Sequence, residues 1–271
     1  MPFATSLAFP DFPTAAWVLL AVAAMLVGLS KTALPGINTI SIAIFAALLP
    51  AKASTGALLL LLIVGDIFAI TIYRRHADWK TLIRLIPAVV VGVGAGALFL
   101  AFASDAWVRR FIGVILLVVI ALTLWQRGRA AALARKGRTG SGDPATAADD
   151  ASHRSSRFTR AAYGSLGGFT TMVANAGGPV MSMYFLAARF PVKAFLGTAA
   201  WFFAVINIVK LPVSIGLGLI TGETLLLALC LIPGIVVGAI AGMWTARRIP
   251  QHLFDWAVIG FTIIGATYLL F

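Results

Sequence analysis

Long apolar segments constrain this chain more than any other feature of its sequence. A helix of about 20 apolar residues crosses the roughly 30 Å of hydrocarbon in a bilayer, and it satisfies its own backbone hydrogen bonds there. Segments that meet or approach this length are 53–73, 81–102, 106–125, 192–216, 223–244 and 252–271. The sequence therefore predicts an all-α polytopic membrane protein.

Composition excludes the main soluble classes. Hydrophobic residues make up 61% of the 271 residues and charged residues 11%, against about 45–50% and about 25% in soluble domains. The net charge of +12 does not indicate nucleic-acid binding, because Lys and Arg lie mostly in short segments between apolar runs. The single Cys230 excludes a disulfide framework within the chain, and the three histidines are far apart in the sequence. We expect no metal and no cofactor.

The two halves of the chain resemble each other. A shift of 141 residues aligns Pro50 with Pro191 and Gly56 with Gly197, and it pairs Asp66 with Asn207. A shift of 146 aligns the segment LIPAVVVGVGAG with LIPGIVVGAIAG. Five of the glycines in these two segments are expected to form small-residue faces for helix packing; they are Gly92, Gly94, Gly96, Gly238 and Gly242. We predict two repeats of about five hydrophobic segments each.

Charge distribution divides and orients the chain. Residues 1–125 form the first repeat and 158–271 the second, while 126–157 are rich in charge, Gly, Ser and Thr and are expected to form a flexible linker. With five segments per half, 16 of the 21 Lys and Arg residues fall on one side and three on the other. The positive-inside rule makes the first side cytoplasmic. Both termini are then outside, and the repeats are inverted, which is an arrangement found in transporters.

Each repeat begins with two short segments separated by a break. The pairs are 14–30 with 35–49, and 158–174 with 177–188, and Pro and Gly are expected to interrupt the helix between them. The second member of each pair would span only about 18–22 Å. We predict two short or re-entrant hairpins that enter from opposite faces, with their tips near the midplane. Discontinuous segments in equivalent places are the best sequence indication of a substrate site.

Polar groups at the two tips favour a small oxoanion. Helix starts present unpaired N–H groups that hold anions, and neutral hydrogen-bonding side chains and one lysine accompany them. An alternative for Lys31 is that its side chain extends to the water interface. The candidate substrate-binding residues are Lys31, Gly36, Asn38, Thr39, Thr171, Asn175, Gly177 and Gly178.

Three further polar residues lie inside apolar segments and are candidates for coupling or gating. Asp66 is an intramembrane carboxylate, which favours a role as a proton carrier or as the partner of a cation. Asn207 is its repeat equivalent, and Lys210 follows three residues later on the same helix face. The alternative is structural, with Asp66 paired to Lys210 or hydrogen-bonded to a neighbouring helix.

The sequence GLSKT-LPG, followed by P-x-K-A-x-x-G and a second copy of that element, resembles the TauE/SafE-type sulfite exporter family, also called TSUP. The resemblance extends over the chain except for residues 126–157. It implies a bacterial inner-membrane secondary carrier of small anions such as sulfite, thiosulfate or organosulfonates. The second tip, ANAGGP, carries no lysine, so the two halves cannot contribute equally to charge neutralisation.

Two other functions are open at this point. An anion channel could use the same site, and a membrane enzyme acting on a lipid phosphate could use two opposed hairpins. The enzyme is disfavoured because no clustered carboxylates or H-E-x-x-H pattern is present, and no Walker A pattern supplies an ATPase. The expected partners are a small anion, the bilayer and a coupling proton or another ion. The sequence leaves the oligomeric state open.

Overall fold

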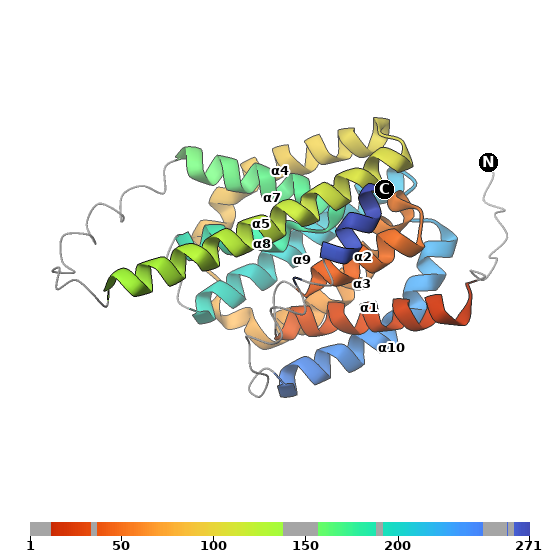
Figure 1. Ribbon diagram of the computed structural model, residues 1–271, viewed down its shortest axis with the longest axis horizontal. Coiled ribbons are helices and arrows are strands. Elements are labelled where there is room, and N and C mark those ends of the chain that lie inside the picture. The colour runs from red at the N-terminus through yellow and green to blue at the C-terminus, as the bar shows by residue number, and fades with distance from the viewer. Residues whose placement is uncertain (1–11, 34–36, 138–156, 188–191, 246–258, 260–262) are drawn as a thin grey trace.

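The computed structural model describes residues 12–33, 37–137, 157–187, 192–245, 259 and 263–271, and these are helical almost throughout with no strand among them (Figure 1). The predicted all-α class is confirmed. The first half contains α1 Thr14–Thr32, α2 Asn38–Leu48, α3 Ala51–Tyr73, the short η1 Arg74–His76, α4 Trp79–Phe102 and α5 Asp105–Gly137. The second half contains α7 Arg157–Ala174, α8 Gly177–Ala187, α9 Val192–Gly216 and α10 Gly222–Thr245.

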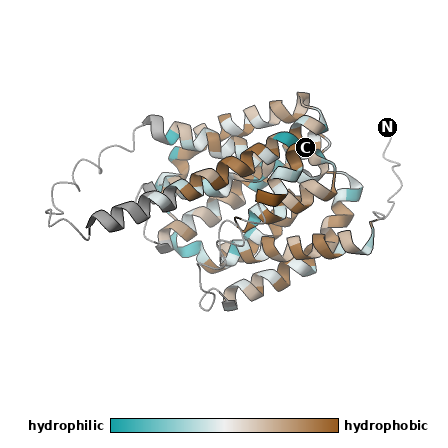
Figure 2. Cartoon of the chain, in the orientation of Figure 1, coloured by the Kyte–Doolittle hydropathy of each residue, from teal (hydrophilic) through white to brown (hydrophobic). Residues whose placement is uncertain are grey.

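Six stretches of the described helices are long and apolar enough to cross a membrane. They are Thr14–Thr32, Ala51–His76, Trp79–Phe102, Asp105–Trp125, Ala194–Gly216 and Gly222–Trp244. Segment 14–30 was expected to be short, but its helix continues to Thr32 and reaches 19 residues. Half of the predicted segment 252–271 lies outside the described residues. Hydrophobic residues cover these helices along most of their length (Figure 2).

Helices α2 and α8 are short, as predicted, with 11 residues each. That length corresponds to about 17 Å and does not cross the hydrocarbon. The break before α8 does not come from its proline, because Pro179 lies in the first turn of the helix, where a missing N–H is tolerated. Instead α7 ends where Asn175 adopts a left-handed conformation with φ of 53°, which Asn tolerates better than most residues. The break before α2 falls partly on residues 34–36, which lie outside the described range.

Helix α5 corrects the expected start of the linker. Residues 126–157 were predicted to be flexible throughout, yet α5 continues to Gly137 and α7 begins at Arg157. The stretch 126–137 contains four Ala and three Arg residues, both of which have high helix propensity. Helix propensity therefore accounts for the continuation of the helix through a polar segment. The remainder of the predicted linker, 138–156, lies outside the described residues.

Glycines let helices from the two halves pack closely. Helix α1 packs along α10 and α7 along α4, and Figure 1 shows these pairs at opposite edges of the molecule. A Cβ on Gly238 of α10 would lie 1.9 Å from the carbonyl oxygen of Met25, and one on Gly92 of α4 would lie 2.0 Å from that of Ser165. The predicted small-residue faces thus exist, except at Gly94, whose Cβ would meet nothing within 4 Å.

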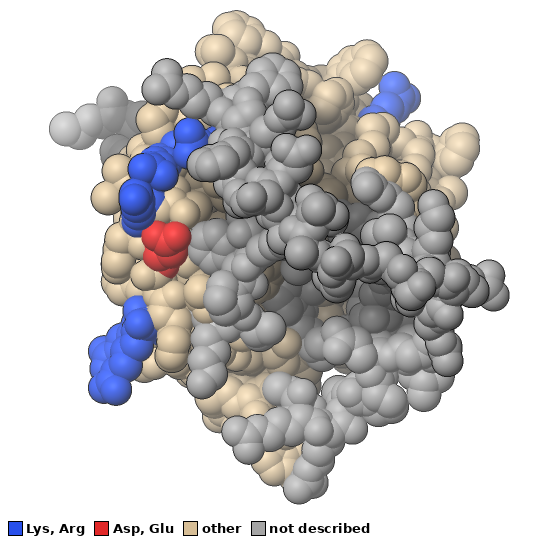
Figure 3. All heavy atoms as spheres, turned by 90° about the vertical axis from the view of Figure 1, so that its left-hand side faces the viewer, with Lys and Arg blue, Asp and Glu red and all other residues tan. Residues whose placement is uncertain are grey.

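Helices α3 and α9 pack against each other between these two pairs. At one end, Asp105 of α5 accepts hydrogen bonds from the backbone N–H groups of Ala51 and Lys52, both at 2.9 Å, and so caps α3. At the other end, the backbone N–H of Asp78 donates to Thr198 Oγ1 of α9 at 2.9 Å. Figure 3 faces the end where α5 finishes and α7 begins, and basic side chains there outnumber acidic ones among the described residues.

Candidate functional site

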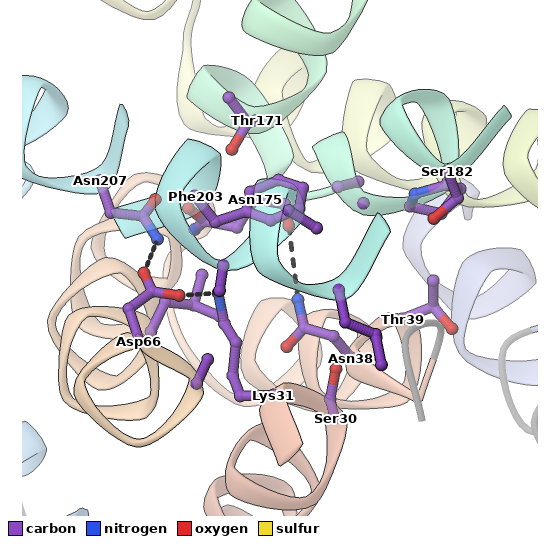
Figure 4. Close-up of a pocket in the computed structure, with 18 of the residues that line it drawn as sticks. Ser30, Lys31, Asn38, Thr39, Asp66, Thr171, Asn175, Ser182, Phe203 and Asn207 are labelled. Carbon is purple, nitrogen blue, oxygen red and sulfur yellow. Dashed lines mark hydrogen bonds and ion pairs between the residues drawn. The ribbon is translucent and has the colours of Figure 1, made fainter. Parts of the chain in front are cut away.

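A buried ion pair lies where α1, α3 and α9 meet. Nζ of Lys31, in the last turn of α1, is 2.5 Å from Oδ1 of Asp66, and the two side chains are 12% and 3% exposed. Nδ2 of Asn207 donates to the other carboxylate oxygen at 2.7 Å. Figure 4 shows these three side chains pointing toward one another. This is the one ion pair within the described part of the chain.

Two neighbours position Lys31. A Cβ on Gly65 would lie 2.9 Å from Cγ of Lys31, so the glycine leaves room for the lysine stem beside α3. The ring of Phe203 has its centroid 5.0 Å from Nζ, which is within the range of a cation–π interaction. Lys31 therefore points into the protein at this site, and the alternative in which it extends to the water interface is not observed.

The second buried lysine holds the junction between α7 and α8. Lys210 is completely buried, and its Nζ donates to the carbonyl oxygen of Thr171 at 2.5 Å and to Oδ1 of Asn175 at 2.7 Å. The structural alternative paired Asp66 with Lys210, but the observed partners of Asp66 are Lys31 and Asn207. The tip in the second half thus receives an ammonium group from α9, although its own sequence contains no lysine.

Asn175 connects four elements at that junction. Its backbone is left-handed, its Nδ2 donates to the carbonyl oxygen of Thr55 at 3.0 Å, and its Oδ1 accepts from Lys210. Its own carbonyl oxygen accepts from Nδ2 of Asn38 at 3.4 Å. The start of α2, the first half of α3 and the second half of α9 are therefore linked through Asn175 at the end of α7.

A cavity of about 90 Å³ surrounds the ion pair. It is far smaller than the roughly 300–1,000 Å³ of pockets for drug-sized ligands. Its polar lining comes from both halves and consists of Ser30, Lys31, Asn38, Thr39, Asp66, Tyr73, Thr171, Asn175, Ser182 and Asn207. Apolar walls, including Phe195 and Phe203, complete it. The cavity thus offers a cation, a carboxylate and neutral polar groups to a small ligand.

Two buried acceptors at this cavity have no donor. Oδ1 of Asn38 and Oδ1 of Asn207 lack a hydrogen-bond partner among the described residues. Their hydrogen bonds fix the orientation of both amide groups. Nδ2 of Asn38 donates to the carbonyl oxygen of Asn175, and Nδ2 of Asn207 donates to the carboxylate of Asp66. A ligand or water in the cavity could donate to these oxygens.

The structure brings most of the predicted site residues together. Lys31, Asn38, Thr39, Asp66, Thr171, Asn175, Gly178 and Asn207 all line the cavity. Gly177 does not, since it packs against Thr171, whose Cβ would lie 2.8 Å from a Cβ on the glycine. Lys210 lies behind the lining and contacts the α7–α8 junction. Gly36 lies outside the described residues.

The sequence analysis missed several residues that line the cavity, although their helical spacing from Asp66 and Asn207 indicates them. Leu62, Ala69 and Tyr73 lie four before, three after and seven after Asp66, on one face of α3. Phe203 precedes Asn207 by four residues on α9. Extending the helical period from the two predicted polar residues would have found all four. Tyr73 also donates from its hydroxyl to the carbonyl oxygen of Thr32 at 2.8 Å, near the end of α1.

Metal binding has no support among the described residues, where no three His, Cys, Asp or Glu side chains could together hold an ion.

Comparison with known families gave one match, in which the family model described as "Sulfite exporter TauE/SafE" covers residues 20–269. No curated protein and no solved structure matched the chain.

Proposed function

Because the chain belongs to the sulfite exporter TauE/SafE family of membrane transporters, we propose that it is a secondary transporter of a small sulfur-containing anion of the sulfite, thiosulfate or organosulfonate class. We place it in the bacterial inner membrane. The observation that carries the proposal is the buried Lys31 in a small polar cavity lined by both halves of the chain. In this proposal the residues that line the cavity hold and orient the anion. The lining of the cavity contains a single carboxylate, that of Asp66, and no histidine.

The anion competes with Asp66 for Lys31. An oxoanion at the cavity accepts hydrogen bonds from the ammonium group of Lys31 and from polar groups at the starts of α2 and α8, where Asn38, Thr39 and Gly178 line the cavity. A proton on Asp66 would free Lys31 for the anion. Proton and anion binding are then linked, which makes Asp66 the coupling residue of this proposal.

The inverted repeat is part of the proposal, and the Asp66–Asn207 contact supports it. These two residues are equivalent under the 141-residue shift, and equivalent residues touch each other only near a two-fold axis. In an inverted repeat that axis lies in the membrane plane, so the site would lie near the midplane. The helix pairs support the same relation. Helix α1 of the first half packs on α10 of the second half, and the equivalent α7 packs on the equivalent α4.

Gly56 and Gly197 give independent support for the repeat. A Cβ on Gly56 of α3 would lie 1.9 Å from the carbonyl oxygen of Leu219, which follows α9. A Cβ on Gly197 of α9 would lie 2.8 Å from the carbonyl oxygen of Tyr73, where α3 ends. Each central helix thus uses the equivalent glycine to approach the end of the other. The junctions α1–α2 and α7–α8 both reach the cavity, as the two hairpins require.

Counterflow in proteoliposomes tests the proposal. Vesicles loaded with unlabelled sulfite, thiosulfate or taurine should accumulate the labelled anion transiently, and the flux should saturate. A flux that neither saturates nor shows counterflow would identify an anion channel instead. Absence of flux for all three anions, in vesicles that contain folded protein, would refute the assigned substrate class.

A further inference from the structure

A second cavity lies between α4 and α7, away from the ion pair. It is an open groove of about 640 Å³ lined by Arg84, Pro87, Ala88, Val91, Arg160, Ala161 and Ser165. We call it the α4–α7 groove. The α4 residues follow the spacing of one helix face, and they face the first three turns of α7. The proposed transport site uses none of these residues.

The groove contains two arginines and no acidic residue. Neither Arg84 nor Arg160 has a carboxylate within 4 Å among the described residues. Asp78, which caps α4, is already engaged, since its two oxygens accept from the backbone N–H and the hydroxyl of Thr81 at 3.2 and 2.8 Å. Two unpaired guanidinium groups that share a groove favour a phosphate, whose oxygens match their planar arrays of donors.

Tight packing joins the two helices that carry the arginines. Next to the groove, Cβ of Ala88 would lie 2.7 Å from a Cβ on Gly164, and Ser165 Oγ donates to the carbonyl oxygen of Ala88 at 3.1 Å. The backbones of α4 and α7 therefore cannot move apart or slide without breaking these contacts. The backbone positions that carry Arg84 and Arg160 are therefore fixed relative to each other.

The groove lies where a lipid headgroup would be. Arg84 follows the half-exposed Trp79 by five residues, which is about 7.5 Å along the helix, and such tryptophans mark the membrane–water interface. Deeper along the same face, Val91 and Leu98 are 66% and 63% exposed, and Gly94 between them leaves open space. An acyl chain can lie along this apolar face while its phosphate lies between the arginines.

The equivalent place in the other pair of helices has no basic residue. Under the 146-residue shift Cys230 of α10 takes the position of Arg84, and it is exposed. On the facing part of α1, Val18 and Leu19 are exposed. The basic groove is therefore specific to α4 and α7, and it lies at the end of the molecule where basic residues are concentrated (Figure 3).

We propose that the α4–α7 groove binds an anionic phospholipid, with Arg84 and Arg160 on its phosphodiester and an acyl chain along α4. Basic pockets between transmembrane helices bind such headgroups in other membrane proteins. A zwitterionic lipid would bring its own ammonium group close to the two arginines. Anionic headgroups are therefore preferred.

Native mass spectrometry of the full-length protein tests this inference. Phosphatidylglycerol, phosphatidylcholine and glycerol 3-phosphate are each titrated into protein in a non-ionic detergent, and the unfolding midpoint is followed in parallel. We expect bound phosphatidylglycerol to raise the midpoint. The double variant Arg84→Gln/Arg160→Gln should bind it at least about tenfold more weakly, since hydrogen bonds to charged groups are each worth about a factor of ten or more.

Arg74→Gln/Arg75→Gln is the matched control, because it removes two exposed charges near the same end but outside the groove. It should keep wild-type affinity for phosphatidylglycerol. An equal loss in the control would show general surface attraction and overturn the proposal. Equal binding of phosphatidylcholine, or equal protection by glycerol 3-phosphate, would also overturn it. The unfolding midpoint of both variants without lipid shows that they are folded.

Discussion

The two lysines inside the apolar segments are held by different kinds of partner. Lys31 has a carboxylate, which an external anion can replace, whereas Lys210 has only the neutral oxygens of Thr171 and Asn175. A charge in the membrane interior is costly unless it is paired or hydrogen-bonded. If a substrate anion takes the place of the Asp66 carboxylate, Lys31 stays paired. Removing Lys210 would leave Oδ1 of Asn175 without a donor, whereas the Thr171 carbonyl oxygen would still accept from the backbone N–H of Asn175 at 3.1 Å. This difference supports the proposal that Lys31 binds the anion, and we expect Lys210 to support the structure.

Substitution of Lys31 tests this assignment. Lys31→Ala should weaken anion binding by roughly 2–5 kcal/mol, because it removes the buried partner of a desolvated anion. Lys52→Ala should have little effect, since Lys52 is partly exposed at the start of α3, where solvent screens charge. Isothermal titration of the purified protein with thiosulfate measures both. Equal affinities for wild type and Lys31→Ala would remove Lys31 from the binding site.

The variant Asp66→Asn distinguishes a role of Asp66 in proton coupling from a role in neutralising Lys31. If Asp66 carries a proton during transport, the variant should lose the dependence of net flux on a pH gradient and keep anion exchange at equilibrium, because the amide has the shape of the protonated acid. If Asp66 only neutralises Lys31, the variant leaves a buried cation unpaired and should lower stability and every transport mode together. Full pH-driven flux in the variant would contradict both roles. Lys31→Met/Asp66→Asn, which restores neutrality, is the control for stability.

The sequence alone predicted which residues form the site better than it predicted which of them bind each other. Asp66 and Asn207 were matched by the repeat, and they are in contact. The pairing of Lys31 with Asp66 depends on the clearance at Gly65, which is a property of packing between helices. Lys210 follows Asn207 by three residues, which is about 60° around the helix and about 4.5 Å along it. That offset is enough to turn its side chain to the α7–α8 junction instead of Asp66.

At the scale of elements, glycines determine which helices from the two halves can approach each other. The pairs α1–α10 and α4–α7 both use them, and sequence indicated their positions through the aligned LIPAVVVGVGAG and LIPGIVVGAIAG segments. Sequence could not tell which glycines of a helix face its partner. Gly92 meets the backbone of α7, whereas Gly94, two residues later, points away from it. The rotation of the helix about its own axis is set by the partner.

This difference gives a matched pair of variants. Gly92→Ala places a Cβ 2.0 Å from the carbonyl oxygen of Ser165, so it should separate α4 from α7 and destabilise the protein by about 1–3 kcal/mol. Gly94→Ala adds a methyl group in open space and should be neutral, or stabilising by up to about 1 kcal/mol. Unfolding of the two variants in the same detergent measures the contrast. Equal stabilities would show that the α4–α7 contact is not close-packed.

At the scale of the whole molecule, two halves of similar sequence surround an asymmetric site. The cavity lies along the second half of α3 and the first half of α9. Around the first half of α3, direct contacts occur instead, where Thr55 Oγ1 donates to the carbonyl oxygen of Val173 at 3.1 Å and its own carbonyl oxygen accepts from Asn175. Repeats in the sequence predict equivalent elements, but they do not predict which of two equivalent spaces is filled in a given state.

The distribution of basic residues predicts the orientation of the molecule in the membrane. We predict that both termini are outside and that residues 126–157 are cytoplasmic, because 16 of 21 basic residues fall on that side and three on the other. A Ser141→Cys variant in a Cys230→Ser background should react with an impermeant thiol reagent only after the cytoplasmic face is opened. Lys52→Cys in the same background should react from outside in intact cells. Labelling of residue 141 from the outer face would reverse the orientation, and with it the side on which the α4–α7 groove meets the membrane surface.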